Sequence, residues 1–162
     1  MNKYITYVTL SLALLISTAA NASATLSVDF TLPEFAKADY RKPYVAIWAE
    51  TKTDSHNLLL WHLTKAKSDK WLVDVRRWWR KEGRYSDNKF DGVTGATKSH
   101  GDHHVELDIS TLPEKFTLFI EVARQKGGRS IVRQKINMND NTTQFNIAAT
   151  QELGAVNIKV NK

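Results

Sequence analysis

Hydrophobic and polar residues alternate with a period of two early in the chain. This alternation over residues 26–32 predicts a strand that is buried on one face, and Pro33 ends it. The next two stretches, 43–53 and 56–63, are apolar at almost every position, which indicates strands covered on both faces. Because these two stretches follow each other closely, we expect them to form a central hairpin.

The period changes between residues 69 and 81. Large apolar residues here recur at helical spacing, which predicts one short helix. Asp69 is the expected N-cap, and the basic residues before Gly83 would complement the negative end of the helix dipole. The polar stretch 83–101 then predicts a long loop, and long loops in compact domains are often functional.

The remainder of the chain returns to strand patterns separated by turn signals. Pro113, Gly127-Gly128 and Asn139-Asp140-Asn141 mark turns, and Gly154 marks a bend or a bulge. Eight short strands and one helix on a crossover predict a mainly β protein, an immunoglobulin-like antiparallel β-sandwich, with a closed barrel as the alternative. The later strands are expected at 103–109, 116–124, 130–137, 143–149 and 153–160.

The first residues have the three-part layout of a secretory signal peptide. An apolar run over 5–16 is too short to span a bilayer of about 30 Å, and small residues follow it. We expect cleavage after Ala22 or Ala24, with an uncleaved N-terminal anchor as the alternative. Residues 25–162 would then form a single periplasmic domain that is not an integral membrane protein.

Composition narrows the possible functions. The chain has no Cys, which excludes disulfides, thiolate metal sites and a lipid anchor on cysteine. Its 23 Lys and Arg against 17 Asp and Glu give a net charge of +6, a modest excess typical of a solvated surface, and we expect no nucleic-acid partner. No Gly-x-Ser-x-Gly elbow is present, so a carrier or an accessory protein is expected rather than an enzyme.

The predicted loop contains the sequence Asp-Gly-Val-Thr-Gly-Ala-Thr, which ends at Thr97. It resembles the target sequence of bacterial flavin transferases, in which an exported enzyme links FMN from FAD to the final Thr. The resemblance implies covalent FMN at Thr97, with Thr94, Gly95 and Ala96 completing the motif. Small residues let a hydroxyl enter another enzyme's site, and Asp91 would bind the transferase's metal or orient the nucleophile. The alternative is a tight loop in which Asp91 caps a turn and Thr97 starts a strand.

A second resemblance covers most of the chain after the signal peptide. Residues 43–48, 72–79 and 121–124, together with the motif, resemble a family of uncharacterised exported bacterial proteins known only as a domain of unknown function. That family is similar to small β-sandwiches and is commonly encoded beside flavin transferases and PepSY-type membrane proteins, which resemble reductases. The resemblance implies two partners, an exported flavin transferase and a PepSY-type membrane reductase.

Two further clusters are candidates for binding. Indole faces of Trp78 and Trp79 could stack on a flavin while Arg76 and Arg77 pair with its phosphate, although Trp at helical spacing beside a sandwich is more often core.

Asp102 and His103 could bind zinc or copper together with the neighbouring His100 and His104. On a strand, however, His103 and His104 point to opposite faces, and the alternative is a polar loop.

Two functional hypotheses therefore remain. The first is a periplasmic redox carrier with FMN on Thr97, in which the flavin performs electron transfer. The second is an unmodified accessory or ligand-binding sandwich that works with a membrane reductase or a flavin transferase system.

Overall fold

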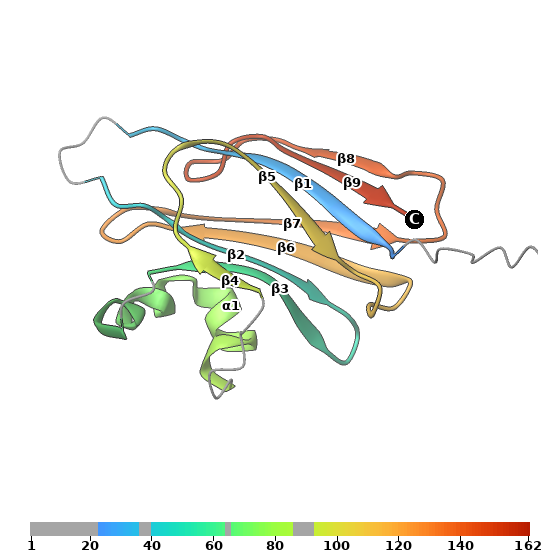
Figure 1. Cartoon of the computed structure of the whole chain (residues 1–162), viewed down its shortest axis with the longest axis horizontal. Coiled ribbons are helices and arrows are strands. Elements are labelled where there is room, and N and C mark those ends of the chain that lie inside the picture. The colour runs from blue at the N-terminus through green and yellow to red at the C-terminus, as the bar shows by residue number, and fades with distance from the viewer. Residues whose placement is uncertain (1–22, 36–39, 64–65, 86–92) are drawn as a thin grey trace, which may run out of the picture.

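The computed structural model describes residues 23–35, 40–63, 66–85 and 93–162. Within these ranges, nine strands form two sheets that face each other, and a helical segment lies outside one of them (Figure 1). The strands are β1 (Thr25–Leu32), β2 (Tyr44–Glu50), β3 (Ser55–His62), β4 (Thr94–Ala96), β5 (Gly101–Asp108), β6 (Lys115–Ala123), β7 (Arg129–Asn137), β8 (Gln144–Ile147) and β9 (Val156–Asn161).

The strand order confirms the predicted β-sandwich. One sheet has the order β5-β1-β9-β8 and the other the order β4-β3-β2-β6-β7. Neighbouring strands are antiparallel except for β3 and β4, which are parallel. The hairpin of β2 and β3 is also confirmed. The prediction of a loop over 83–101 is wrong at β4, which is a strand. The sequence did not indicate it, because three residues are too few to show an alternating pattern.

The period of two places one face of each sheet in a shared core. The four apolar residues of β1, from Leu26 to Leu32, are at most 3% exposed and pack against the inner face of the other sheet. Strand β2 is buried on both faces, as predicted, because Val45 and Ile47 face the sandwich core while Tyr44 and Trp48 face the helical segment.

The single helix predicted over 69–81 is in fact divided at Val75 into a 3₁₀ helix and an α-helix. A 3₁₀ helix, η1 (Ala66–Asp74), is followed by α1 (Arg76–Lys81) and by a short 3₁₀ helix, η2 (Gly83–Tyr85). Asp69 is therefore not the N-cap of α1, whose N-cap is Val75. The first-turn amides of α1 instead donate to the carboxylate of Glu121 on β6, with an N···O distance of 2.9 Å from Trp78. A cap supplied by another strand leaves no local sequence signal.

The helical segment forms a third layer over the sheet of β2, β3 and β6. Leu72, Val75 and Trp78 pack against Trp48 and Phe119, whose rings are stacked with centroids 5.1 Å apart. None of the helices in the described part of the chain has the length and apolar character needed to cross a membrane.

Candidate functional site

The described part of the flavin-transferase-like motif forms an edge strand. Leu60 N–H donates to the carbonyl of Val93 at 2.9 Å, and Thr97 N–H donates to the carbonyl of His62 at 3.2 Å. Between these bonds, Thr94 and Gly95 pair with Leu60 and Trp61. Among the described strands, β4 has β3 as its single neighbour. Asp91 and Gly92 lie outside the described residues.

The side chain of Thr97 belongs to the inner side of this edge. Paired residues share a face, so Gly95 lies on the face of Trp61, and Thr97, two residues further, points to the same side. Thr97 is 8% exposed, whereas Thr94 and Ala96 are exposed. A second enzyme therefore meets little exposed surface at Thr97 while β4 is paired with β3.

An aromatic cluster, here called the β4 shelf, lies beside Gly95. It consists of Phe30, Trp61 and His103, whose ring centroids lie 5.3 to 5.6 Å apart. A Cβ built on Gly95 would lie 3.3 Å from Cδ1 of Trp61, so the absence of a side chain permits this close approach. The ammonium of Lys98 lies 5.9 Å from the centroid of a Trp61 ring.

No local sequence signal connects Phe30 and Trp61 with the motif. In the sequence, these two residues have the pattern of ordinary core positions in strands. They lie near the motif and His103 only because β4 pairs with β3 and β5 pairs with β1, and both pairings are long-range. His103 was singled out, but as a metal ligand.

The Arg and Trp cluster lies in the outer layer rather than beside the β4 shelf. Trp78 is fully buried and its Nε1 donates to Oδ1 of Asn57 at 3.0 Å, so it takes the core position that the sequence favoured over a stacking role. Arg77 donates to both carboxylate oxygens of Glu50, at 3.1 and 2.8 Å. Its guanidinium also lies 4.3 Å from the centroid of Phe119. Burial disfavours ionisation of Glu50, but the hydrogen bonds from Arg77 and Trp48 outweigh this effect and lower its pKa.

The two other residues of that cluster differ in burial. Trp79 is half-buried and packs against the outer layer, and Arg76 is exposed. Their proposed contacts with a flavin stay predictions.

The candidate metal ligands Asp102 and His103 do not come together. They are neighbours on β5 and point to opposite faces. Asp102 accepts a hydrogen bond from the Thr31 hydroxyl at 2.6 Å, and His103 Nε2 lies 2.9 Å from the carbonyl of Ser99. His104 is bonded to Asp29 instead. The described ranges contain no group of three or more His, Asp or Glu residues that could hold a metal ion.

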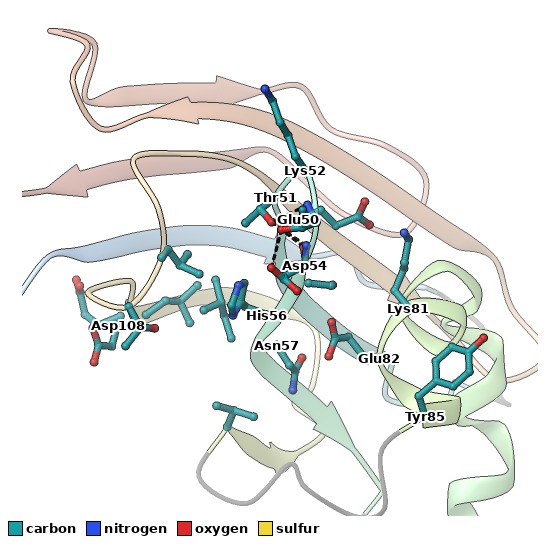
Figure 2. Close-up of a pocket in the computed structure, with 18 residues that line it drawn as sticks. Glu50, Thr51, Lys52, Asp54, His56, Asn57, Lys81, Glu82, Tyr85 and Asp108 are labelled. Carbon is teal, nitrogen blue, oxygen red and sulfur yellow. Dashed lines mark hydrogen bonds between the residues drawn. The ribbon is translucent and has the colours of Figure 1, made fainter.

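A second concave feature, here called the β3 groove, has a volume of about 1070 Å³. Figure 2 shows Asn57 of β3 between a wall from α1 and η2, which carries Lys81, Glu82 and Tyr85, and a wall from β5, which carries Asp108. None of its residues belongs to the motif strand β4, although Val93 lines one end. The groove is lined by Glu50, Thr51, Lys52, Thr53, Asp54, Ser55, His56, Asn57, Leu58, Lys81, Glu82, Tyr85, Val93, Glu106, Leu107, Asp108, Thr111 and Leu112.

Comparison with known proteins gives one positive finding. A family described as "Predicted periplasmic protein (DUF2271)" matches residues 25–155. The match begins at the first residue of β1 and ends immediately before β9, so it includes the edge strand β4, the β4 shelf and the β3 groove. No curated protein matches the chain.

Proposed function

Because the chain belongs to the DUF2271 family of predicted periplasmic proteins, we propose that it is a periplasmic electron carrier with FMN attached covalently to Thr97. The observation that carries the proposal is the position of the motif. Its final Thr directly follows a three-residue edge strand, which lies beside the aromatic residues of the β4 shelf. The proposed partners are an exported flavin transferase, which loads the chain, and a PepSY-type membrane reductase, which donates electrons.

The proposed modification is a phosphoryl-group transfer from FAD. The Thr97 hydroxyl oxygen bonds to the phosphorus on the FMN side of the FAD diphosphate, and the bond from that phosphorus to the AMP oxygen breaks. AMP leaves, the hydroxyl proton passes to solvent, and the product is an FMN phosphodiester of Thr97. The flavin would supply the electron transfer, and the chain would hold and orient it.

Because Thr97 is largely buried, detachment of β4 would give the transferase access to its hydroxyl. This step is plausible on energetic grounds, because the pairing covers three residues and parallel pairs are slightly weaker than antiparallel ones. Detachment would also uncover the part of Trp61 that Gly95 approaches, and aromatic faces of this kind suit a planar ring system.

The test is coexpression of the chain with an exported flavin transferase, followed by intact-mass measurement. We expect one added FMN phosphoryl group in the parent chain and none in Thr97→Ala. Thr142→Ala is the matched control, because it removes an exposed Thr hydroxyl outside the motif and should leave the addition in place. An unchanged mass, with the transferase active on a known target, would refute the proposal.

The low exposure of Thr97 favours a second candidate, an unmodified accessory module of the same membrane reductase or transferase system. In that case β4 stays paired and the Thr97 hydroxyl remains inside. The same experiment separates the two, because an accessory module stays colourless and gains no mass.

A further inference from the structure

A pocket of about 450 Å³ lies between the helical layer and the turn that joins β6 to β7, and it is here called the hairpin pocket. Figure 1 shows this turn, in orange, at the same end of the molecule as the start of the helical segment, in green. One wall carries Trp71 and Arg76 from the helical layer, and the other carries Lys126 and Arg129 from the hairpin. The volume is within the range of small-molecule sites.

The hairpin pocket is basic. Four of its lining residues are cationic, and Asp74 is the one acidic residue described in its walls. Arg124 is buried and donates to both carboxylate oxygens of Glu152, at 2.9 and 2.8 Å, so its charge is balanced within the fold. Arg129 gives one nitrogen to the buried carboxylate of Glu121, but its side chain stays 37% exposed.

Arg76 and Lys126 supply the unbalanced charge of the pocket. Both residues are exposed, and among the described residues neither has a carboxylate partner, Asp74 included. Like charges that line one cavity repel each other, and an anion bound between them removes this repulsion. The charges of the described walls therefore favour an anionic ligand.

Lys126 has a backbone conformation that its residue type disfavours. Its φ is +57°, and in the described part of the chain it is the one non-Gly residue with a positive φ. It is the third residue of a turn in which the Gly127 N–H donates to the Arg124 carbonyl at 2.8 Å, a position where a positive φ favours Gly or Asn. Residues held in disfavoured conformations cluster at functional sites, and here the turn holds a cation on the wall of the pocket.

A phosphate group fits this arrangement better than a carboxylate. Guanidinium groups form paired hydrogen bonds with phosphate oxygens, and a lysine ammonium binds phosphate as a point charge. A phosphate monoester carries nearly two negative charges at neutral pH and has three acceptor oxygens, so it can contact both walls at once. The half-buried Trp71 adds an apolar surface to the helical wall, and the ammonium of Lys70 lies 5.2 Å from the centroid of its ring.

We propose that the hairpin pocket binds the phosphate group of a small molecule. Arg76 and Lys126 would contact the phosphate from opposite walls, Arg129 would add a third cation, and Trp71 would lie against the rest of the ligand. None of the described residues that line the pocket belongs to β3, β4 or β5, so the site is separate from the β4 shelf. The proposal does not depend on modification of Thr97.

The test is a titration of the ¹⁵N-labelled chain with inorganic phosphate at about pH 8 and constant ionic strength. We expect saturable changes in the amide signals of residues 126–129 and none at Lys135, an exposed cation further along β7. Acetate carries a single charge and should bind more weakly at the same ionic strength. The absence of a saturable change, an equal change at Lys135, or equal affinity for acetate would overturn the proposal.

Two matched variants test the contact from the helical wall. Arg76→Gln should weaken phosphate binding about ten-fold, because it removes a charge-assisted hydrogen bond. Arg80→Gln makes the same charge change one turn later on α1, outside the pocket, and should leave the affinity unchanged. Equal weakening by both variants would contradict the hairpin pocket as the binding site.

Lys126→Gly separates contact with the ligand from the stability of the turn. It should also weaken phosphate binding about ten-fold. Because Gly adopts a positive φ without steric cost, the thermal midpoint should not fall. An unchanged affinity in this variant would remove Lys126 from the site and refute the proposal.

Anionic lipid headgroups are a second source of phosphate. To separate the two sources, vesicles that contain phosphatidylglycerol are mixed with the chain at physiological salt and sedimented. We expect the chain to remain in the supernatant. Sedimentation that Arg76→Gln abolishes and Arg80→Gln retains would show a lipid headgroup in the pocket and would overturn the proposal of a small molecule.

Discussion

At the residue scale, Glu121 is a buried carboxylate that is held by donors from α1 and β7. It is fully buried, and its carboxylate accepts hydrogen bonds from the amides of Arg77 and Trp78 and from the guanidinium of Arg129, the last at 2.6 Å. One carboxylate therefore joins β6, β7 and the first turn of α1. A buried charge is tolerated only where donors surround it in this way.

Glu121→Gln should lower the free energy of unfolding by about 3 kcal/mol, because the amide places an N–H group against donors that need an acceptor. Urea unfolding followed by circular dichroism measures this change. Glu114→Gln, on an exposed side chain, should shift stability by less than about 0.5 kcal/mol. Similar changes in the two variants would show that the Glu121 contacts contribute little.

At the element scale, polar side chains join β1 to β5 on the outer face of their sheet. His104 lies 2.7 Å from the Asp29 carboxylate and 3.1 Å from that of Glu106, and the Ser27 hydroxyl donates to Glu106 at 2.5 Å. The hydrogen bond to Asp29 is the largest effect that raises the pKa of His104 above 6.5. The Ser27 hydrogen bond is the largest effect that lowers the pKa of Glu106 below 4.5.

These shifts predict opposite pH dependences. A raised folded-state pKa means that His104 stabilises the fold below pH 6.5 and that this contribution disappears as the pH rises through the folded value. Glu106 stabilises the fold above pH 4.5 and loses its contribution as the pH falls through its lowered value. Both contributions are therefore present between pH 4.5 and 6.5.

His104→Gln should flatten the loss of thermal stability above pH 6.5, because the variant has no proton to release there. Thermal midpoints measured across the neutral and alkaline range check this expectation, with His100→Gln as the control on the same side of the sheet edge. An unchanged slope in His104→Gln would assign the pH dependence to other groups.

Element by element, the sequence predicted what local patterns determine. The strands from Thr25–Leu32 to Val156–Asn161 were located, with the exception of β4, because one-sided or two-sided burial leaves a period of two. Strand β4 and the break at Val75 were not predicted, since both depend on pairing partners on β3 and β6. The β4 shelf was missed for the same reason, as Trp61 gives no local sign of its approach to Gly95.

At the scale of the whole molecule, the protein is a sandwich with a third, helical layer. Strand β1 is central to its sheet, with β5 on one side and β9 on the other. Thr25 pairs with both Asp108 and Asn161, which are distant in sequence. Three apolar residues of β9, namely Val156, Ile158 and Val160, contribute to the core beside β1.

A chain that stops at residue 155 should therefore lack a cooperative thermal unfolding transition, although the family match ends there. Removing β9 exposes one edge of β1 and deletes three buried side chains, a loss that exceeds the usual stability of a domain of this size. Circular dichroism on heating measures the transition. Removal of Lys162 alone should leave it intact, and a sharp transition in the shortened chain would disprove the central role of β9.

The central position of β1 also affects the order in which the strands can pair during synthesis. A polypeptide leaves the ribosome, and crosses a membrane, from its N-terminus, so β1 emerges first and its partner β9 last. The hairpins of β2 with β3 and of β6 with β7 can close as they appear, because their strands are adjacent in sequence. During this interval β9 is not yet available to pair with β1, and the apolar residues of β1 lack part of their core. A holding chaperone would need to shield this segment until synthesis or transport is complete.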